Sequence, residues 1–173
     1  MSRSYRRIVN RRGGPLPTHR ATARLSAYVY GNILTLAAVV VATPETIADG
    51  HAALLVLFTG LTTYISHVFA EFVAHSSTST TGVHMGEELA DARPIASSAT
   101  IPAIALALGW LGWIPTHWAF FVAGGVVVLR IASIQVIVQR VRGNPLTPLV
   151  FIAGLATAAI AAVIVVLKVV LTH

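Results

Sequence analysis

Five apolar segments, each close to the length that crosses a bilayer, dominate the sequence. The segments are residues 25–42, 53–75, 95–113, 118–139 and 147–171. A helix of about 20 apolar residues spans the hydrocarbon core of a membrane. Charged residues make up only 10 % of the chain, against about 25 % in soluble proteins, and the mean hydropathy is +0.77. The sequence therefore predicts an all-α, polytopic membrane helical bundle with five transmembrane helices.

Basic residues are distributed unevenly around these segments, and this predicts their orientation. Seven of the twelve Lys and Arg residues lie within residues 1–24. The turns on the same side of the membrane hold one and two more, whereas the opposite side holds only Lys168. Cytoplasmic segments of membrane proteins are enriched in Lys and Arg. We therefore expect the N-terminus inside and the C-terminus outside, with 1–24 as a basic cytoplasmic arm and 25–173 as one transmembrane domain.

The second segment carries an ionisable stripe in which His67, Glu71 and His75 recur at a spacing of four. On an α-helix these side chains lie within an arc of roughly 80°. Ionisable groups inside a membrane segment are costly, so they are candidates for function. Imidazole and carboxylate suit divalent Fe, Mn, Zn or Co, and histidine also carries protons near neutral pH. The outer two residues are roughly 12 Å apart, so one ion needs further ligands from other helices.

The polar segment 76–94 is the expected cytoplasmic loop between the second and third helices, with Pro94 closing it. It holds four more metal ligands or proton carriers, which are His84, Glu87, Glu88 and Asp91. We interpret these residues as the place where a metal ion first binds on the cytoplasmic side.

Two further polar residues, Asn32 and Arg130, interrupt the apolar segments. The helical rise places Asn32, His67 and Glu71 about 10, 12 and 6 Å from the inner boundary, and Arg130 about 15 Å from it. All four are therefore expected in one layer. In one interpretation, Glu71 and Arg130 form a structural ion pair. In the other, His67, Glu71 and His75, supported by Asn32, form a cation path with Arg130 as a counter-ion. Arg130 opposes a cation at its own level unless Glu71 neutralises it.

Several classes of function are disfavoured. The chain has no cysteine, which excludes disulfides and thiolate metal sites. We find no nucleophile–base arrangement, phosphate-binding loop or organic-cofactor signature, so we do not expect an enzyme. The pI near 10.8 reflects the basic arm and predicts contact with the lipid bilayer, not with nucleic acid. The Ala/Val/Arg-rich composition suggests a multi-pass protein of a bacterial inner membrane.

The layout resembles the vacuolar iron transporter family, with five spans and a carboxylate-bearing cytoplasmic segment between the second and third. Residues 24–40, RLSAYVYGNILTLAAVV, lie where that family has a first-helix motif with Gly-Ala-Asn-Asp-Gly. Residues 128–167, VLRIASIQVIVQRVRGNPLTPLVFIAGLATAAIAAVIVVL, resemble its closing helix pair. The likeness covers the whole chain as topology.

The resemblance implies a homodimer that exchanges Fe(II) or Mn(II) for protons and exports the metal from the cytoplasm. It matches Glu71 to a carboxylate near the end of the second helix, and Glu87 and Glu88 to metal-gathering glutamates. Two features differ from the family: Asn32 replaces an acid, and the loop has only about twenty residues. Alternatives are a non-transporting membrane subunit and a small proton or ion conductor that uses the stripe.

Overall fold

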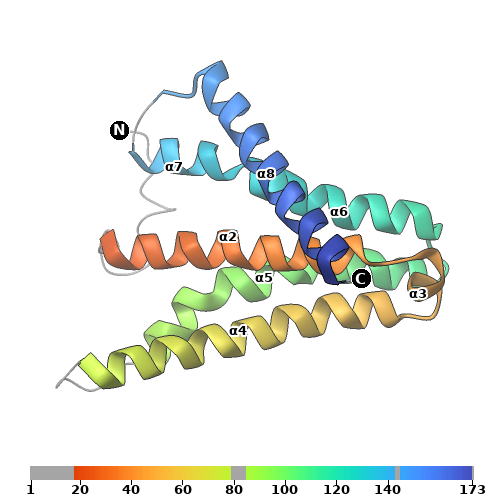
Figure 1. Ribbon diagram of the computed structural model, residues 1–173, viewed down its shortest axis with the longest axis horizontal. Helices are drawn as coiled ribbons and strands as arrows, with labels where there is room; N and C mark the ends of the chain where they lie inside the picture. The colour runs from red at the N-terminus through yellow and green to blue at the C-terminus, as the bar shows by residue number, and fades with distance from the viewer. Residues whose placement is uncertain (1–17, 79–84, 143–144, 173) are drawn as a thin grey trace.

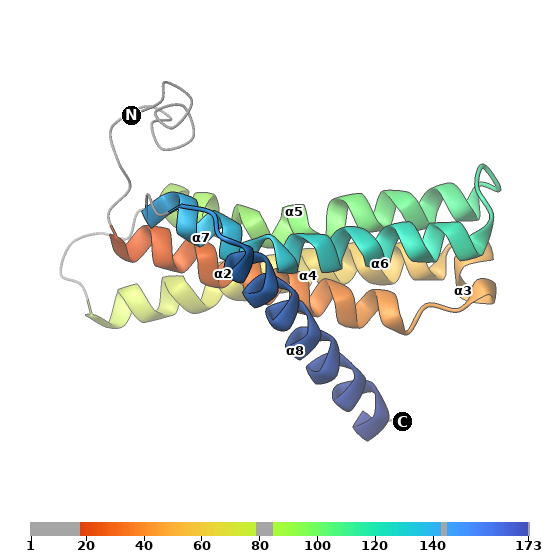
Figure 2. The ribbon, with the colours of Figure 1, turned by 90° about the horizontal axis from the view of Figure 1, so that it is seen from above.

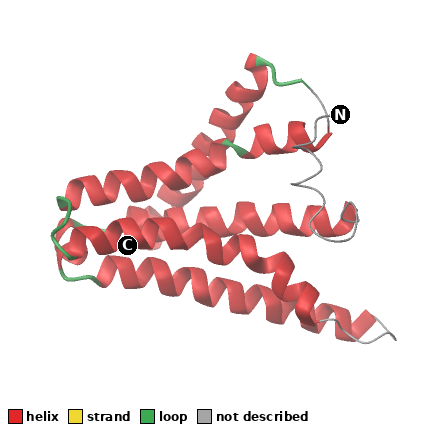
Figure 3. Ribbon diagram, turned by 180° about the vertical axis from the view of Figure 1, so that it is seen from behind, coloured by secondary structure: helices red, strands yellow, loops and turns green. Residues whose placement is uncertain are grey.

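The computed structural model describes residues 18–78, 85–142 and 145–172, and every element in these ranges is a helix (Figure 1, Figure 3). The helices are α2 (Thr18–Val40), α3 (Pro44–Ala48), α4 (His51–Thr78), α5 (Met85–Trp110), α6 (Thr116–Ala132), α7 (Ile134–Arg142) and α8 (Pro148–Thr172). The predicted all-α class is confirmed.

Within the described residues, three helical stretches are long and apolar enough to cross a membrane. They are Thr22–Val40, His51–Ala74 and Thr116–Gln139, the last running through α6 into α7. Pro148–Val163 of α8 is a shorter apolar stretch. The five spans and their orientation stay a prediction.

Four of the helices, α2, α4, α5 and α6, lie alongside one another as a bundle, while α8 leaves it at a steep angle (Figure 2). The end near α3 holds one apolar core cluster, with Val39, Val56 and Leu106 among its buried members. The end near α7 holds another, in which Leu36 and Val127 meet Ala158 of α8. We call these the α3 end and the α7 end.

Small residues let these helices approach closely. A Cβ added at Gly60 of α4 would clash with the Cβ of Ala99 in α5. A Cβ added at Gly154 of α8 would clash with the carbonyl oxygen of Ala132, where α6 ends. Close backbone approach at small residues is a common mode of helix packing in membranes. These contacts set how each helix is rotated about its own axis.

The connection from α2 to α4 is a capped turn that contains the short helix α3. Thr43 and Thr46 form a reciprocal capping box, and Pro44 is at the first turn, where its missing N–H costs nothing. Gly50 follows with a φ of +85°, and the indole of Trp110 lies 3.0 Å from the position its Cβ would occupy. The positive φ favours glycine there, and any side chain would also have to displace the indole.

Asp49 joins α3 to α4 by accepting hydrogen bonds at Oδ1. The backbone N–H of His51 donates to it over 2.9 Å, and the His51 Nδ1 also lies 2.9 Å away. The hydrogen bond from that backbone N–H is the main cause that lowers the pKa of Asp49 below its ordinary value. The carboxylate therefore caps the start of α4 in its charged form.

Residues 76–94 differ from the expected loop, because α4 continues to Thr78 and α5 already begins at Met85. Pro94, expected to close the loop, lies inside α5. Proline removes a backbone donor from a helix. Here the missing N–H is the one that would bond the Ala90 carbonyl. One turn further on, the Ser97 hydroxyl donates to the Pro94 carbonyl over 2.9 Å. Helix α5 thus continues through a residue that usually ends a helix.

Two other boundaries also differ from the sequence-based expectation. Helix α2 begins at Thr18, so the end of the basic arm is helical. The predicted fourth helix is divided at Ser133 into α6 and α7, although backbone hydrogen bonds from Ser133 to Leu129 and from Ile137 to Ser133 continue across this point. The Ser133 hydroxyl donates to the carbonyl of Arg130 over 2.7 Å, a bond that often bends helices.

Candidate functional site

A polar groove opens between α2 and α4. Its walls are Tyr30 from α2 and Thr62, Thr63, Ser66, His67 and Ala70 from α4. All of these except Ala70 carry a hydroxyl or an imidazole, and the groove has a volume of about 310 Å³. Apolar side chains of α4 beside it are exposed, including Phe69 at 66 %. We call this feature the His67 groove.

The predicted helix through the ionisable stripe is confirmed, since α4 covers it from end to end. His67 and Glu71 are both half-buried and lie one turn apart on α4. Glu71 takes part in an interaction of its own. His75 follows one turn further on, but its side chain lies outside the described residues. The groove thus brings His67 together with hydroxyl groups, with Glu71 next to it toward the α7 end.

Arg130 belongs to a different polar site, between α2, α5 and α6. Its guanidinium donates to the carbonyl oxygen of Ser97 over 2.9 Å and to the Ser97 hydroxyl over 3.2 Å. Its Cζ also lies 5.1 Å from the centroid of the Tyr28 ring, a favourable place for a cation. Among the described residues, no carboxylate lies within ion-pair distance of Arg130. The ion pair between Glu71 and Arg130, one of the two sequence-based interpretations, therefore does not hold Arg130 in place.

The same site extends into the centre of the bundle. The hydroxyls of Thr35 in α2 and Ser98 in α5 lie 3.0 Å apart and are buried. Asn32 has no exposed surface, and its Nδ2 donates to the Tyr28 carbonyl over 2.7 Å. The Asn32 Oδ1 and the Arg130 Nε are both buried without a hydrogen-bond partner. We call this site the central polar cluster; its members are Tyr28, Asn32, Thr35, Ser97, Ser98 and Arg130.

Helix α2 separates the central polar cluster from the His67 groove. Tyr28 and Asn32 are four residues apart and share one face of α2. Tyr30 is two residues from each, which turns it roughly 200° away, and it is Tyr30 that lines the groove. The expected single layer of Asn32, His67, Glu71 and Arg130 is therefore divided between two sites. Asn32 does not line the groove with His67.

The residues proposed for first metal binding are also distributed differently. Asp91 forms an ion pair with Arg24, with 2.6 Å between Oδ1 and Nε, which ties α5 to α2. His84 lies outside the described residues. Glu87 and Glu88 lie on the first turn of α5, and their side chains are outside the described part as well.

The described residues of one chain do not form a complete metal site. In those ranges, no three His, Asp or Glu side chains come close enough together to hold a metal ion. His67 and Glu71 are the described members of the predicted ligand set that lie beside the groove. An ion bound there would need oxygen atoms from the hydroxyls or ligands from outside the described residues.

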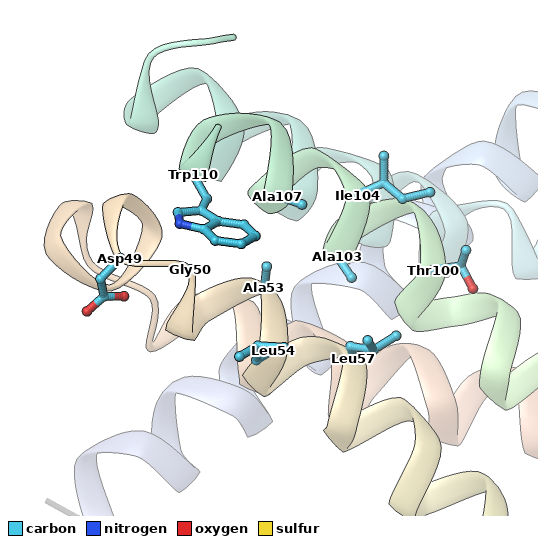
Figure 4. A pocket seen from close by; sticks show the side chains of 10 residues that line it. All are labelled: Asp49, Gly50, Ala53, Leu54, Leu57, Thr100, Ala103, Ile104, Ala107 and Trp110. Carbon is cyan, nitrogen blue, oxygen red and sulfur yellow. The ribbon is translucent and has the colours of Figure 1, made fainter. Parts of the chain in front are cut away.

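A second groove, between α4 and α5 at the α3 end, has apolar walls and a volume of about 290 Å³. Figure 4 shows the Trp110 indole over Gly50, with Ala53 on α4 facing Ala103 and Ala107 on α5. Asp49 lies at its mouth, with its carboxylate engaged by His51. The groove lacks the polar lining of an ion path.

Sequence reasoning missed Ser97 and Tyr28 as the partners of Arg130. The distance of each residue from the α5–α6 turn could have identified Ser97, because this short turn places the end of α5 and the start of α6 at the same level. Ser97 lies 13 residues before the end of α5 and Arg130 14 residues after the start of α6, about 20 Å in each case. An arginine inside an apolar helix predicts a hydrogen-bond acceptor at matching depth on its neighbour.

Comparison of the chain with protein-family models, with curated proteins and with solved structures found no match. The resemblance to the vacuolar iron transporter family therefore stays a prediction from the sequence. What the two polar sites do has to be inferred from their own residues.

Proposed function

We propose that the chain is a five-span transporter of a divalent transition metal such as Fe(II) or Mn(II), coupled to protons, with the His67 groove in the ion path. The observation that carries this function is a groove of hydroxyl and imidazole groups within an apolar span, His51–Ala74. Such groups are costly against acyl chains, so the groove favours water, an ion or another protein chain.

The placement of Arg130 removes an electrostatic objection to a cation in this groove. Arg130 is held by Ser97 and Tyr28, on the face of α2 opposite to Tyr30. A cation beside His67 therefore does not pass the guanidinium. Glu71, one turn along α4, supplies a carboxylate, and imidazole plus carboxylate is a ligand pair suited to these metals.

The resemblance to the vacuolar iron transporter family implies export, and the charges at the two ends of the bundle give its orientation. The stripe of His67, Glu71 and His75 leads toward the α7 end, where the basic start of α2 and the basic end of α7 lie. We assign this end to the cytoplasm by the positive-inside rule. Metal then enters from the cytoplasm and leaves across a bacterial inner membrane, while the C-terminus lies outside.

A second copy of the chain completes the site in our proposal. Thr62, Ser66, Ala70 and Ala74 recur every four residues on α4, and all are exposed. Small residues at this spacing allow two membrane helices to pack closely. A homodimer along this stripe covers the groove and adds the partner's copies of the groove ligands, which one chain needs to enclose an ion.

Cysteine cross-linking tests this dimer, because the natural chain has no cysteine. We expect Ser66→Cys, under mild oxidation in membranes, to give a band of twice the monomer mass. Leu155→Cys, on the exposed face of α8, is the matched control and should stay monomeric. A Ser66→Cys chain that stays monomeric would contradict the α4 interface.

Metal flux into liposomes tests the function itself. Purified protein is reconstituted, and a metal-sensitive dye inside the vesicles reports influx of Mn(II), Fe(II), Co(II) or Zn(II). We expect saturable flux that Glu71→Gln abolishes while the protein still inserts. Glu45→Gln, in the exposed helix α3, is the matched control and should transport normally. Unchanged flux in Glu71→Gln would rule the proposal out.

A proton conductor that uses His67 and Glu71 without metal is the second candidate. It is favoured by one observation, that no three metal ligands gather in the described part of a chain. A pH-sensitive dye in the same vesicles measures proton flux and so distinguishes a proton conductor from a metal transporter. Proton flux that needs no metal and disappears in His67→Ala would replace metal transport as the function.

A further inference from the structure

Arg130 lies at a surface of the α5–α6 pair whose large exposed side chains nearby are apolar, with the exposed Arg93 and Thr100 one turn either side of Ser97. It is half-buried, its partner Ser97 is exposed, and both lie well inside the bundle's length. The exposed side chains around them include Leu129 at 70 % and Ile101 at 49 %. Arg130 is also part of the candidate span Thr116–Gln139. In a membrane, this surface meets acyl chains or another protein.

The charge of Arg130 is only partly stabilised within the described chain. Its hydrogen bonds go to the neutral carbonyl and hydroxyl of Ser97, and the Tyr28 ring is also neutral. Its Nε is buried without a partner. Neutral dipoles lower the cost of a cation inside a membrane, but a carboxylate lowers it much further. The guanidinium also offers the donor geometry that binds a carboxylate through two hydrogen bonds.

Among the described side chains, neither α8 nor a second copy of the chain has a carboxylate placed to bind Arg130. Glu87 and Glu88 lie on the first turn of α5, nine or more residues before Ser97. Helix α8 packs against Ala132, which lies roughly 200° around α6 from Arg130. Asp91 is engaged by Arg24 near the α7 end, and Glu45 and Asp49 lie in the connection at the α3 end. Counted from the α3 end, Glu71 is 20 residues along α4, whereas Arg130 is only 14 residues along α6. Glu71 therefore lies about 9 Å nearer the α7 end than Arg130.

We infer that the Arg130–Ser97 surface docks a transmembrane helix of another protein, one that carries a single carboxylate at the depth of Arg130. The carboxylate accepts hydrogen bonds from the guanidinium, in place of the Ser97 hydroxyl. Ser97 remains satisfied, because that hydroxyl already donates to the Pro94 carbonyl. The apolar rim around Leu129 and Ile101 packs against the rest of the docked helix. This surface is separate from the His67 groove, so docking does not depend on transport.

Model transmembrane peptides test the inference with the natural chain. The probe is a Leu/Ala helix of about 20 residues with one central Glu, and the control has Gln at that position. Each peptide is mixed with full-length, fluorophore-labelled protein in phosphatidylcholine vesicles, and association is measured by energy transfer. We expect the Glu peptide to associate about tenfold more tightly than the Gln peptide. Arg130→Lys should keep part of this preference and Arg130→Gln should lose it.

Three results would overturn the inference. The first is equal association of the Glu and Gln peptides with the natural chain, which needs no variant to fold. The second is a Glu preference that survives in Arg130→Gln with unchanged helical content. The third is a preference that disappears when anionic phosphatidylglycerol is added, since a lipid phosphate would then be the better occupant.

Discussion

The central polar cluster and the His67 groove lie on opposite faces of α2, and they use their polar groups differently. In the cluster, side chains of three helices bond one another: the Thr35 hydroxyl bonds that of Ser98, and the Arg130 guanidinium donates to the Ser97 hydroxyl. In the groove, the Thr62 hydroxyl donates to carbonyls of its own helix, and the lining side chains surround an open space between α2 and α4. Polar groups that bind across helices hold a membrane bundle together. Polar groups that line an open groove remain accessible to an ion, so we assign structure to the cluster and transport to the groove.

Placing the same large residue in both regions should give the largest difference. A Cβ at Gly31 would lie 2.9 Å from the Ile95 Cα and 3.0 Å from the Ser98 Oγ, so Gly31→Leu pushes α2 away from α5. We expect a loss of about 3 kcal/mol in the free energy of unfolding, measured by denaturant titration in detergent. Ser66→Leu, in the groove and on the proposed dimer stripe, should weaken dimerisation but change the free energy of unfolding of the monomer by less than about 0.5 kcal/mol. An equal loss of unfolding free energy in Gly31→Leu and Ser66→Leu would contradict the assignment of a structural role to the cluster and not to the groove.

Deleting single hydroxyls should give a smaller, still measurable difference. Thr35→Val or Ser98→Ala leaves the other buried hydroxyl without its partner across the helices, which we expect to cost about 1 kcal/mol. The double variant should cost less than the sum of the two, as a double-mutant cycle would show. Thr62→Val is the control in the groove and should be close to neutral. Additive costs for Thr35 and Ser98 would show that they do not interact.

The smallest effect is expected at the connection between α3 and α4, which belongs to neither region. The pKa of Asp49 is lower in the folded chain, mainly through the hydrogen bond from the His51 backbone N–H. Its stabilising contribution is therefore complete above the ordinary pKa of an aspartate and is lost as the pH falls below about 4. Thermal unfolding followed by circular dichroism across this range should show the decrease. Asp49→Asn, which cannot titrate, should show less of it.

The sequence predicted the helices well because their signal is local. Apolar length and the spacing of His67 and Glu71 are properties of one segment, and α4 has the expected form. The helix through Pro94 was not predicted, because a proline usually ends a helix. Helix α5 packs against α2, α4 and α6 there, and such tertiary contacts are not revealed by composition.

The arrangement of the polar residues was harder to predict than their depth. Helical rise gives the level of Asn32 and His67 in a membrane, but it does not give the direction in which each side chain points. That direction is set by tertiary contacts such as Gly31 against Ile95 and Gly60 against Ala99. These close contacts turn Asn32 into the core and leave His67 in the groove. Pairing residues by depth alone therefore assigned Glu71 to Arg130, where the structure has Ser97.

Metal binding by purified, detergent-solubilised protein tests the division between the two regions most directly. Mn(II) is titrated from micromolar to millimolar concentrations against the natural chain, Glu71→Gln beside the groove and Asn32→Ala in the cluster. We expect saturable binding that Glu71→Gln removes and Asn32→Ala leaves unchanged, with helical content equal in all three. Absence of binding to the natural chain, or its loss in Asn32→Ala alone, would contradict the assignment of the ion path to the His67 groove.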